Sequence, residues 1–246
     1  QRAKAASKIA KAGAVSAFGR WLADPTLGPP EVAARALSEI ALDNPDTQAQ
    51  IAEEGAISPL VTMAGAWRRL TDAVTNEVDP EAPELTAAEG VAKARAAKNA
   101  AAVVLRVANV AAGALATLAK DNIINQLIIT EEQGIPPLVD LLRTKASSFE
   151  NPTKALWHLA VTEDNQTAIG KAGGIAPLVS LLTSDHELTV QCAAAAIRSL
   201  ARDHPENQIA VAKAGAIAPL IDLLGSDDTE TQKHAVGALL HLASQD

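Results

Sequence analysis

The sequence predicts an all-α protein, built as a solenoid of about five stacked three-helix repeats. The first observation is a unit at residues 207–243, NQIAVAKAGAIAPLIDLLGSDDTETQKHAVGALLHLA, whose pattern recurs along the chain. The second is a glycine in matching local sequence at intervals of 42, 79, 39 and 42 residues: Gly13, Gly55, Gly134, Gly173 and Gly215. The third is an apolar stripe on the last helix of the unit, which a single copy cannot bury but stacked copies can.

Local signals predict the three helices of residues 207–243. The first begins at Asn207 and ends before Gly215, because glycine readily takes the left-handed conformation that terminates a helix. The second covers about 218–224, with Pro219 in its first turn, where no backbone donor is needed. The third runs over 229–242, with Asp228 or Thr229 as its N-cap. Its apolar residues at helical spacing are Ala235, Ala238, Leu239 and Leu242.

Taken in order, the repeats are expected at about residues 1–43, 44–121, 122–163, 164–205 and 206–246. In repeat one, a third helix from Pro30 to Leu42 places proline and Glu31 in its first turn, where both are favourable. Solenoid ends normally carry polar caps. Neither terminus shows such a cap, so we expect the chain to be a segment of a longer one.

Repeat two is longer than the others by about 36 residues. Apolar residues continue its second helix at helical spacing beyond Trp67, and Asp79-Pro80-Glu81-Ala82-Pro83 then forces a turn. Thr86 and Glu89 form a capping-box pattern ahead of a long helix-forming run to Lys120. We therefore expect a helical hairpin at residues 64–100, projecting roughly 20 Å. A disordered surface loop is the alternative, because the middle of the insertion is acidic and proline-rich.

A period near 42 residues with the signature Gly-Ala-Ile-x-Pro-Leu-Val resembles the armadillo repeat family, and the likeness covers nearly the whole chain. The resemblance implies a right-handed superhelix whose third helices line a concave groove. It also implies a non-enzymatic protein that binds a partner segment in that groove.

Composition narrows the functional class. The net charge of −8 disfavours a surface that follows nucleic-acid phosphates. The single cysteine, Cys192, excludes an internal disulfide and fits a reducing compartment. The cytoplasm is therefore expected, with nuclear, ciliary and organellar locations left open. The most apolar run, 100–119, is interrupted by Arg106 and Asn109, so no membrane span is expected.

Residues for catalysis, a metal or a cofactor do not form a recognisable pattern. The five histidines make no HExxH motif or closely paired ligand set. Neighbouring carboxylates, such as Glu163-Asp164 and Asp227-Asp228, fall in predicted turns and caps rather than in a pocket. We therefore expect no enzymatic activity, no metal and no cofactor.

Import receptors of the armadillo family hold extended peptides with a tryptophan and, four residues later, an asparagine on each third helix. The tryptophan positions here carry Arg35, Gly113, Lys154, Ala195 and Gly237. The asparagine positions carry Glu39, Thr117, His158, Ser199 and His241. None matches, and the groove positions hold acids and bases in equal number, which does not favour a basic nuclear localisation signal.

The sequence thus predicts a scaffold that binds a protein or peptide. Its predicted groove residues are Arg35, Glu39, Asn109, Thr117, Lys154, His158, Gln191, Ser199, Lys233 and His241. A second contact is expected at Trp67, Arg68 and Arg69 in the insertion. The alternatives are the substrate-recruiting domain of a ubiquitin ligase, a nuclear-import adaptor, a subunit of a large assembly, and a groove that is only a solvated surface.

Overall fold

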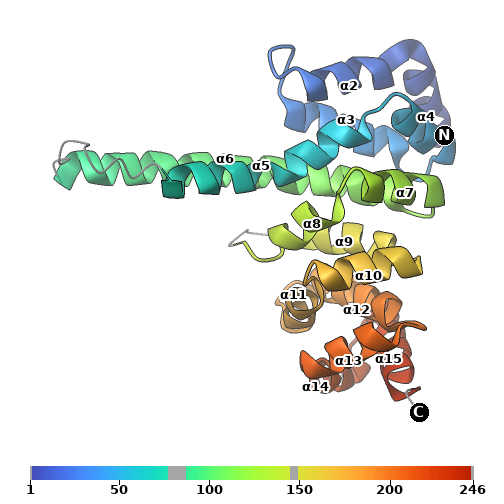
Figure 1. The fold of residues 1–246 in the computed structure, drawn as a ribbon. Coiled ribbons are helices and arrows are strands. Elements are labelled where there is room, and N and C mark those ends of the chain that lie inside the picture. The colour runs from blue at the N-terminus through green and yellow to red at the C-terminus, as the bar shows by residue number, and fades with distance from the viewer. Residues whose placement is uncertain (1, 77–86, 145–148, 245–246) are drawn as a thin grey trace.

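A computed structural model describes residues 2–76, 87–144 and 149–244, and the elements in these ranges are helices joined by short turns (Figure 1). The helices are α1 (Arg2–Ile9), α2 (Val15–Ala23), α3 (Pro30–Ala41), α4 (Pro45–Glu53), α5 (Ile57–Asn76), α6 (Ala87–Ala119), α7 (Ile123–Glu131), α8 (Ile135–Leu141), α9 (Glu150–Leu159), α10 (Glu163–Lys171), α11 (Ile175–Ser180), a 3-10 turn (Leu181–Thr183), α12 (Glu187–Ala201), α13 (Pro205–Lys213), α14 (Ile217–Asp222), a 3-10 turn (Leu223–Gly225) and α15 (Thr229–Ala243). The chain kinks at Gly13 within Ala10–Ala14, the segment that joins α1 to α2.

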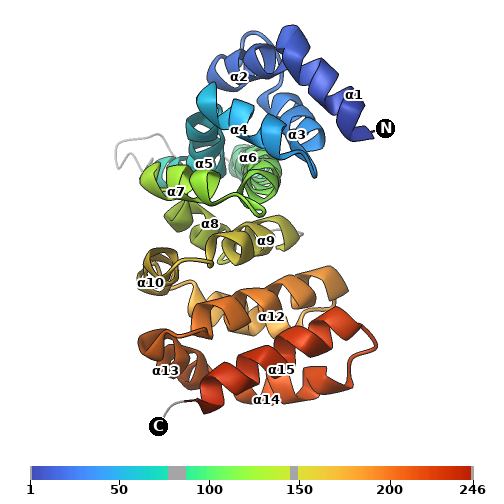
Figure 2. The same cartoon turned by 90° about the vertical axis from the view of Figure 1, so that its right-hand side faces the viewer.

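The helices stack as the sequence predicts. The third helices α3, α6, α9, α12 and α15 follow one another along one side of the molecule (Figure 2). The first helices α4, α7, α10 and α13 lie along the opposite side, so the chain forms an α-solenoid. Asp228 caps α15, accepting a hydrogen bond from the backbone N–H of Thr231.

One core runs through the stack, built from the same positions in successive repeats. Matching positions are fully buried in four first helices (α4, α7, α10 and α13), four second helices (α5, α8, α11 and α14) and four third helices (α3, α6, α9 and α12). These fully buried residues are Ile51, Ile129, Ile169 and Val211; Leu60, Leu138, Leu178 and Leu220; and Leu37, Leu115, Leu156 and Ile197. Because each module buries its apolar face against its neighbours, the modules stabilise one another.

Buried side-chain amides tie the start of three first helices, α7, α10 and α13, to the end of the preceding third helix. Asn207 Nδ2 donates to the carbonyls of Leu200 and Gln166, both at 3.1 Å. Asn125 Nδ2 donates in the same way to Leu118 O at 3.0 Å and Gln48 O at 3.3 Å. The last carbonyls of a helix lack intrahelical partners, so these amides satisfy groups that would otherwise be buried unpaired.

Backbone geometry corrects the expected repeat register at one place. Gly13, Gly55, Gly173 and Gly215 all take positive φ, whereas Gly134 has φ −73° and is the N-cap residue of α8. The positive φ in that repeat belongs to Gln133, at 59°. Gly134 corresponds instead to Gly174, and both pack close to an isoleucine of the preceding first helix. The sequence alignment was therefore one residue out of register in repeat three.

The insertion in repeat two contributes to two long helices, α5 and α6, which project together from the stack (Figure 1). The predicted turn at Asp79–Pro83 and the Thr86 cap lie outside the described residues. Near the stack, Arg68 of α5 pairs with Asp140 at 2.9 Å, and Asp140 also accepts from Arg143 at 3.1 Å. Arg143 donates further to the carbonyls of Ala172 and Gly173. These bonds connect α5 to the next two repeats.

Part of α6 resembles a membrane span in its composition. Residues Arg95–Ala119 are long and apolar enough to cross a bilayer, and 39% of their most apolar stretch is buried in the fold. The helical segments 205–213 and 217–225, which are joined at a bend, are long and apolar enough to cross a bilayer only if they are counted together. Core helices of soluble proteins have this composition too, and α6 packs between α3 and α9 (Figure 2). The length and hydrophobicity of α6 therefore do not distinguish a membrane span from a core helix.

Candidate functional site

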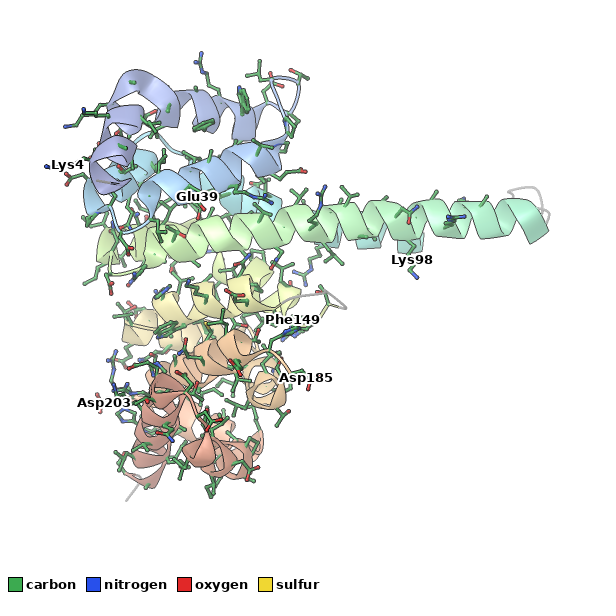
Figure 3. The ribbon with its side chains drawn as sticks, turned by 180° about the vertical axis from the view of Figure 1, so that it is seen from behind. Lys4, Glu39, Lys98, Phe149, Asp185 and Asp203 are labelled. Atoms are coloured by element: carbon green, nitrogen blue, oxygen red, sulfur yellow. The ribbon has the colours of Figure 1, made fainter. Side chains whose placement is uncertain are left out.

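The third-helix face is the side of α3, α6, α9, α12 and α15 that carries the ten predicted groove residues. Seen from behind, it runs the length of the stack, with Glu39 at the junction of α3 and α6 (Figure 3). Arg35, Glu39 and Lys233 are exposed. The other seven are partly buried: Asn109, Thr117, Lys154, His158, Gln191, Ser199 and His241.

Several of these residues are engaged within the fold. Thr117 Oγ1 lies 2.9 Å from Ser38 Oγ of the previous third helix and also donates to Gly113 O. Gln191 Nε2 donates to Asp228 Oδ2 at 2.9 Å. Thr117 and Gln191 therefore link neighbouring repeats, a role the sequence did not predict for them.

Two further residues of the face, Lys233 and Asn109, also form contacts within the fold. The Lys233 ammonium pairs with Glu230 at 2.7 Å. The backbone carbonyl of Asn109 accepts from Asn151 Nδ2 at 3.0 Å, while its own side-chain oxygen is buried without a partner. Binding at Lys233 would have to compete with its ion pair, and the buried Asn109 oxygen is not accessible to a partner.

Three rings form a cluster in the C-terminal half of the face, defined here as the ring cluster: Trp157, His158 and His234. The Trp157 and His158 rings are stacked, with centroids 4.6 Å apart and planes at 22°. His234 of α15 meets Trp157 of α9 edge to face at 5.6 Å. α12 lies between α9 and α15 in the stack (Figure 2), and its residue Ala195 is buried.

Each histidine of the ring cluster has one ring nitrogen that is buried without a hydrogen-bond partner, Nε2 in His158 and Nδ1 in His234. An enclosed N–H with no acceptor is costly, so these nitrogens are best left unprotonated. The ring proton then resides on the other nitrogen, Nδ1 of His158 and Nε2 of His234.

The electrostatic surroundings also keep both rings neutral. Burial, reinforced by the positive charge of Lys154, lowers the pKa of His158 to about 4. Burial and the Arg198 guanidinium hold the pKa of His234 below its usual range. At neutral pH both imidazoles are therefore uncharged hydrogen-bond donors.

Arg198 of α12 lies against α15 at Gly237, where a Cβ would come within 2.5 Å of its Nε atom. Beside it is a hollow of about 500 Å³ lined by Arg198, Thr229, Gln232, Lys233, Val236, Gly237 and Leu240. Val236 and Leu240 are 46% and 65% exposed, so this hollow has an apolar floor and cationic edges.

A family model for the Armadillo/beta-catenin-like repeat matches residues 162–202 and 204–244. Residues 162–244 are armadillo repeats.

The whole chain shares the armadillo solenoid fold of solved structures. An engineered protein is 27% identical, with a TM-score of 0.76 over 99% of this chain and 85% of the other. A designed armadillo repeat protein is 26% identical, with a TM-score of 0.73 over 96% and 85%. Computationally designed armadillo repeat proteins for modular peptide recognition are also 26% identical, with a TM-score of 0.69 over the same shares. The comparison with curated proteins returned no match.

The insertion contact is described only in part. The side chains of Trp67 and Arg69 lie outside the described portion. Arg68 is 62% exposed but is held by Asp140 at the base of α5. In this armadillo solenoid, Arg68 therefore helps to fix the projecting helices whether or not it touches a partner.

Potential chemical groups elsewhere in the armadillo solenoid are dispersed. Among the described residues, no three His, Cys, Asp or Glu side chains come together as metal ligands. Cys192 is buried, and burial raises the pKa of its thiol to about 11. A thiol with that pKa is a poor nucleophile at neutral pH.

Sequence reasoning missed Trp157, Arg198 and His234 as members of the site. The adjacent Trp157-His158 pair was a visible signal on one helix. No local pattern shows that His234, one repeat beyond the intervening α12, meets it.

Proposed function

We propose that this armadillo solenoid is a non-enzymatic scaffold that holds an extended segment of a partner protein on its third-helix face. The observation that carries the proposal is that polar side chains at two registers of the third helices, four residues apart, are at least partly accessible on one face: Arg35 and Lys154 at the first register, Glu39 and His241 at the second. Packed helices are about 8–10 Å apart, and an extended chain advances about 3.3 Å per residue. Each third helix can therefore serve about three residues of a bound peptide.

The comparisons support a peptide as the partner. The designed armadillo repeat proteins made for modular peptide recognition share this fold over 96% of the chain at 26% identity. The amides of Asn165 and Asn207 donate to Leu159 O and Leu200 O at the end of the preceding third helix, and these bonds keep the third helices in fixed register. A rigid, repeated surface favours affinity because little order must be gained on binding.

The test is selection from a displayed library of random peptides with the full chain, followed by affinity measurement. The Arg35→Ala/Lys154→Ala variant changes the third-helix face, and we expect it to weaken selected peptides by about tenfold or more. The matched control, Lys171→Ala/Lys213→Ala, removes two exposed lysines from the opposite side and should leave affinity unchanged. Failure to select any peptide, or equal losses in both variants, would contradict the proposal.

A further inference from the structure

The ring cluster is the most distinctive feature of the third-helix face. It presents three ring N–H groups, those of Trp157 Nε1, His158 Nδ1 and His234 Nε2, and none of them has an acceptor among the described residues. Neutral ring N–H groups can donate to a partner without first losing an internal hydrogen bond. This part of the face therefore lacks acceptors rather than donors.

Cations flank the ring cluster, and the acids near it are mostly engaged. Neither Lys154 nor Arg198 forms an ion pair with a described residue. On α15, Glu230 pairs with Lys233.

Three other acids complete the surroundings, and one of them is Glu150, four residues before Lys154 on α9. Asp228 accepts hydrogen bonds from Thr231 and Gln191, which are neutral donors, so it keeps its negative charge. Asp121 also faces His158, but it affects that ring less than Lys154 does. Lys120, the other cation near His158, is paired with Asp43. Among the charged neighbours, Lys154 has the largest effect on the pKa of His158 and Arg198 on the pKa of His234, and both are cations.

We propose that the ring cluster, with Lys154 and Arg198, recognises an acidic residue of the bound peptide, and that an adjacent apolar residue enters the hollow on α15. This inference rests on the proposed function, since it assigns chemistry to one end of the third-helix face. A carboxylate can accept from two donors while it lies between two cations, and charge-assisted bonds of this kind are the strong ones. Val236 and Leu240 give the neighbouring side chain an apolar surface.

The direct test uses two synthetic peptides of about ten residues that differ only at the centre, Asp-Leu-Asp-Leu in one and Asn-Leu-Asn-Leu in the other. With the full chain we expect the acidic peptide to bind about tenfold more tightly. Arg198→Gln should reduce this preference to about threefold or less, because it removes one cation without disturbing the core. Lys171→Gln, the same charge change on the opposite side, should leave the preference intact.

A second readout locates the contact. Binding should change the intrinsic fluorescence of the parent but not that of Trp157→Phe, which keeps a ring for His158 and His234 to pack against. Because the pKa values of both imidazoles are lowered, affinity for the acidic peptide should be flat between about pH 7 and 8. A preference that falls as pH rises through the usual histidine pKa would show that charged imidazoles bind the peptide, contrary to the inference.

The outcomes separate this inference from the broader proposal. If selected peptides are neutral or basic and still depend on Arg35 and Lys154, the scaffold function stands and the acidic preference is wrong. If the preference exists but Arg198→Gln does not reduce it, the recognition site lies elsewhere. If no peptide binds the third-helix face, both proposals fail.

Discussion

Replacing Asn207 with alanine should destabilise the protein by about 2–3 kcal/mol. Asn207 is 4% exposed, and its amide donates to Gln166 O and Leu200 O at 3.1 Å each. Alanine leaves both carbonyls without this donor in a buried setting. A net hydrogen bond contributes about 1–1.5 kcal/mol, and the two lost bonds give the stated range.

The assay is urea denaturation followed by circular dichroism, with hydrogen exchange to locate the effect. We expect a lower midpoint with an unchanged slope. Exchange should increase first in α13 and at the end of α12, because stability in a solenoid is set by neighbouring repeats. The matched control is Asn99→Ala, the same substitution at an exposed position of α6, which should change stability by about 0.5 kcal/mol or less. Equal stability of the two variants would refute the role assigned to the buried amides.

Three further perturbations test other parts of the structure. Gly134→Ala should lower the free energy of unfolding by about 1–3 kcal/mol, because its Cβ would lie 2.6 Å from Ile129 Cγ2 and 2.8 Å from Ile129 O. In contrast, the Cβ of Gly19→Ala would meet nothing within 4 Å, so this variant should stabilise α2 by up to about 1 kcal/mol. Thermal melts of both variants check these expectations. The folded-state pKa of His158, lowered from 6.5 to about 4, favours its neutral form, so its contribution is present above pH 6.5 and is lost as pH falls toward 4. For this partly exposed ring the contribution is at most about 3 kcal/mol. Between pH 7 and pH 4, the free energy of unfolding of the parent should fall by up to this much more than that of His158→Gln, as measured by denaturation at both pH values. Parallel pH profiles of the two proteins would contradict the prediction. Burial raises the pKa of the Cys192 thiol to about 11, so a thiol reagent at pH 7.5 should react with it only as fast as the protein unfolds locally. Rapid labelling of the folded chain would contradict this prediction, because it would show that the thiol is accessible.

The sequence by itself determined the architecture, because a solenoid is encoded by local and repeated signals. Apolar residues at three- and four-residue spacing define helices, glycines and prolines end them, and the period places each copy next to the last. Such signals predicted α3 to within one residue of its observed end and the N-cap at Asp228. They failed by one residue at Gly134. In this repeat Gln133 takes the positive φ and Gly134 packs closely against an isoleucine, whereas in the next repeat Gly173 and Gly174 take these two roles and both are glycines.

Only the tertiary structure decided which side chains of the third-helix face meet, and which are already engaged. Trp157 of α9 meets His234 of α15 across the intervening α12, and Arg198 can lie on α15 because Gly237 has no side chain. Contacts between repeats depend on how the helices curve past one another and on the size of side chains from several helices at once. A linear pattern records spacing within one helix, but it does not record this combination.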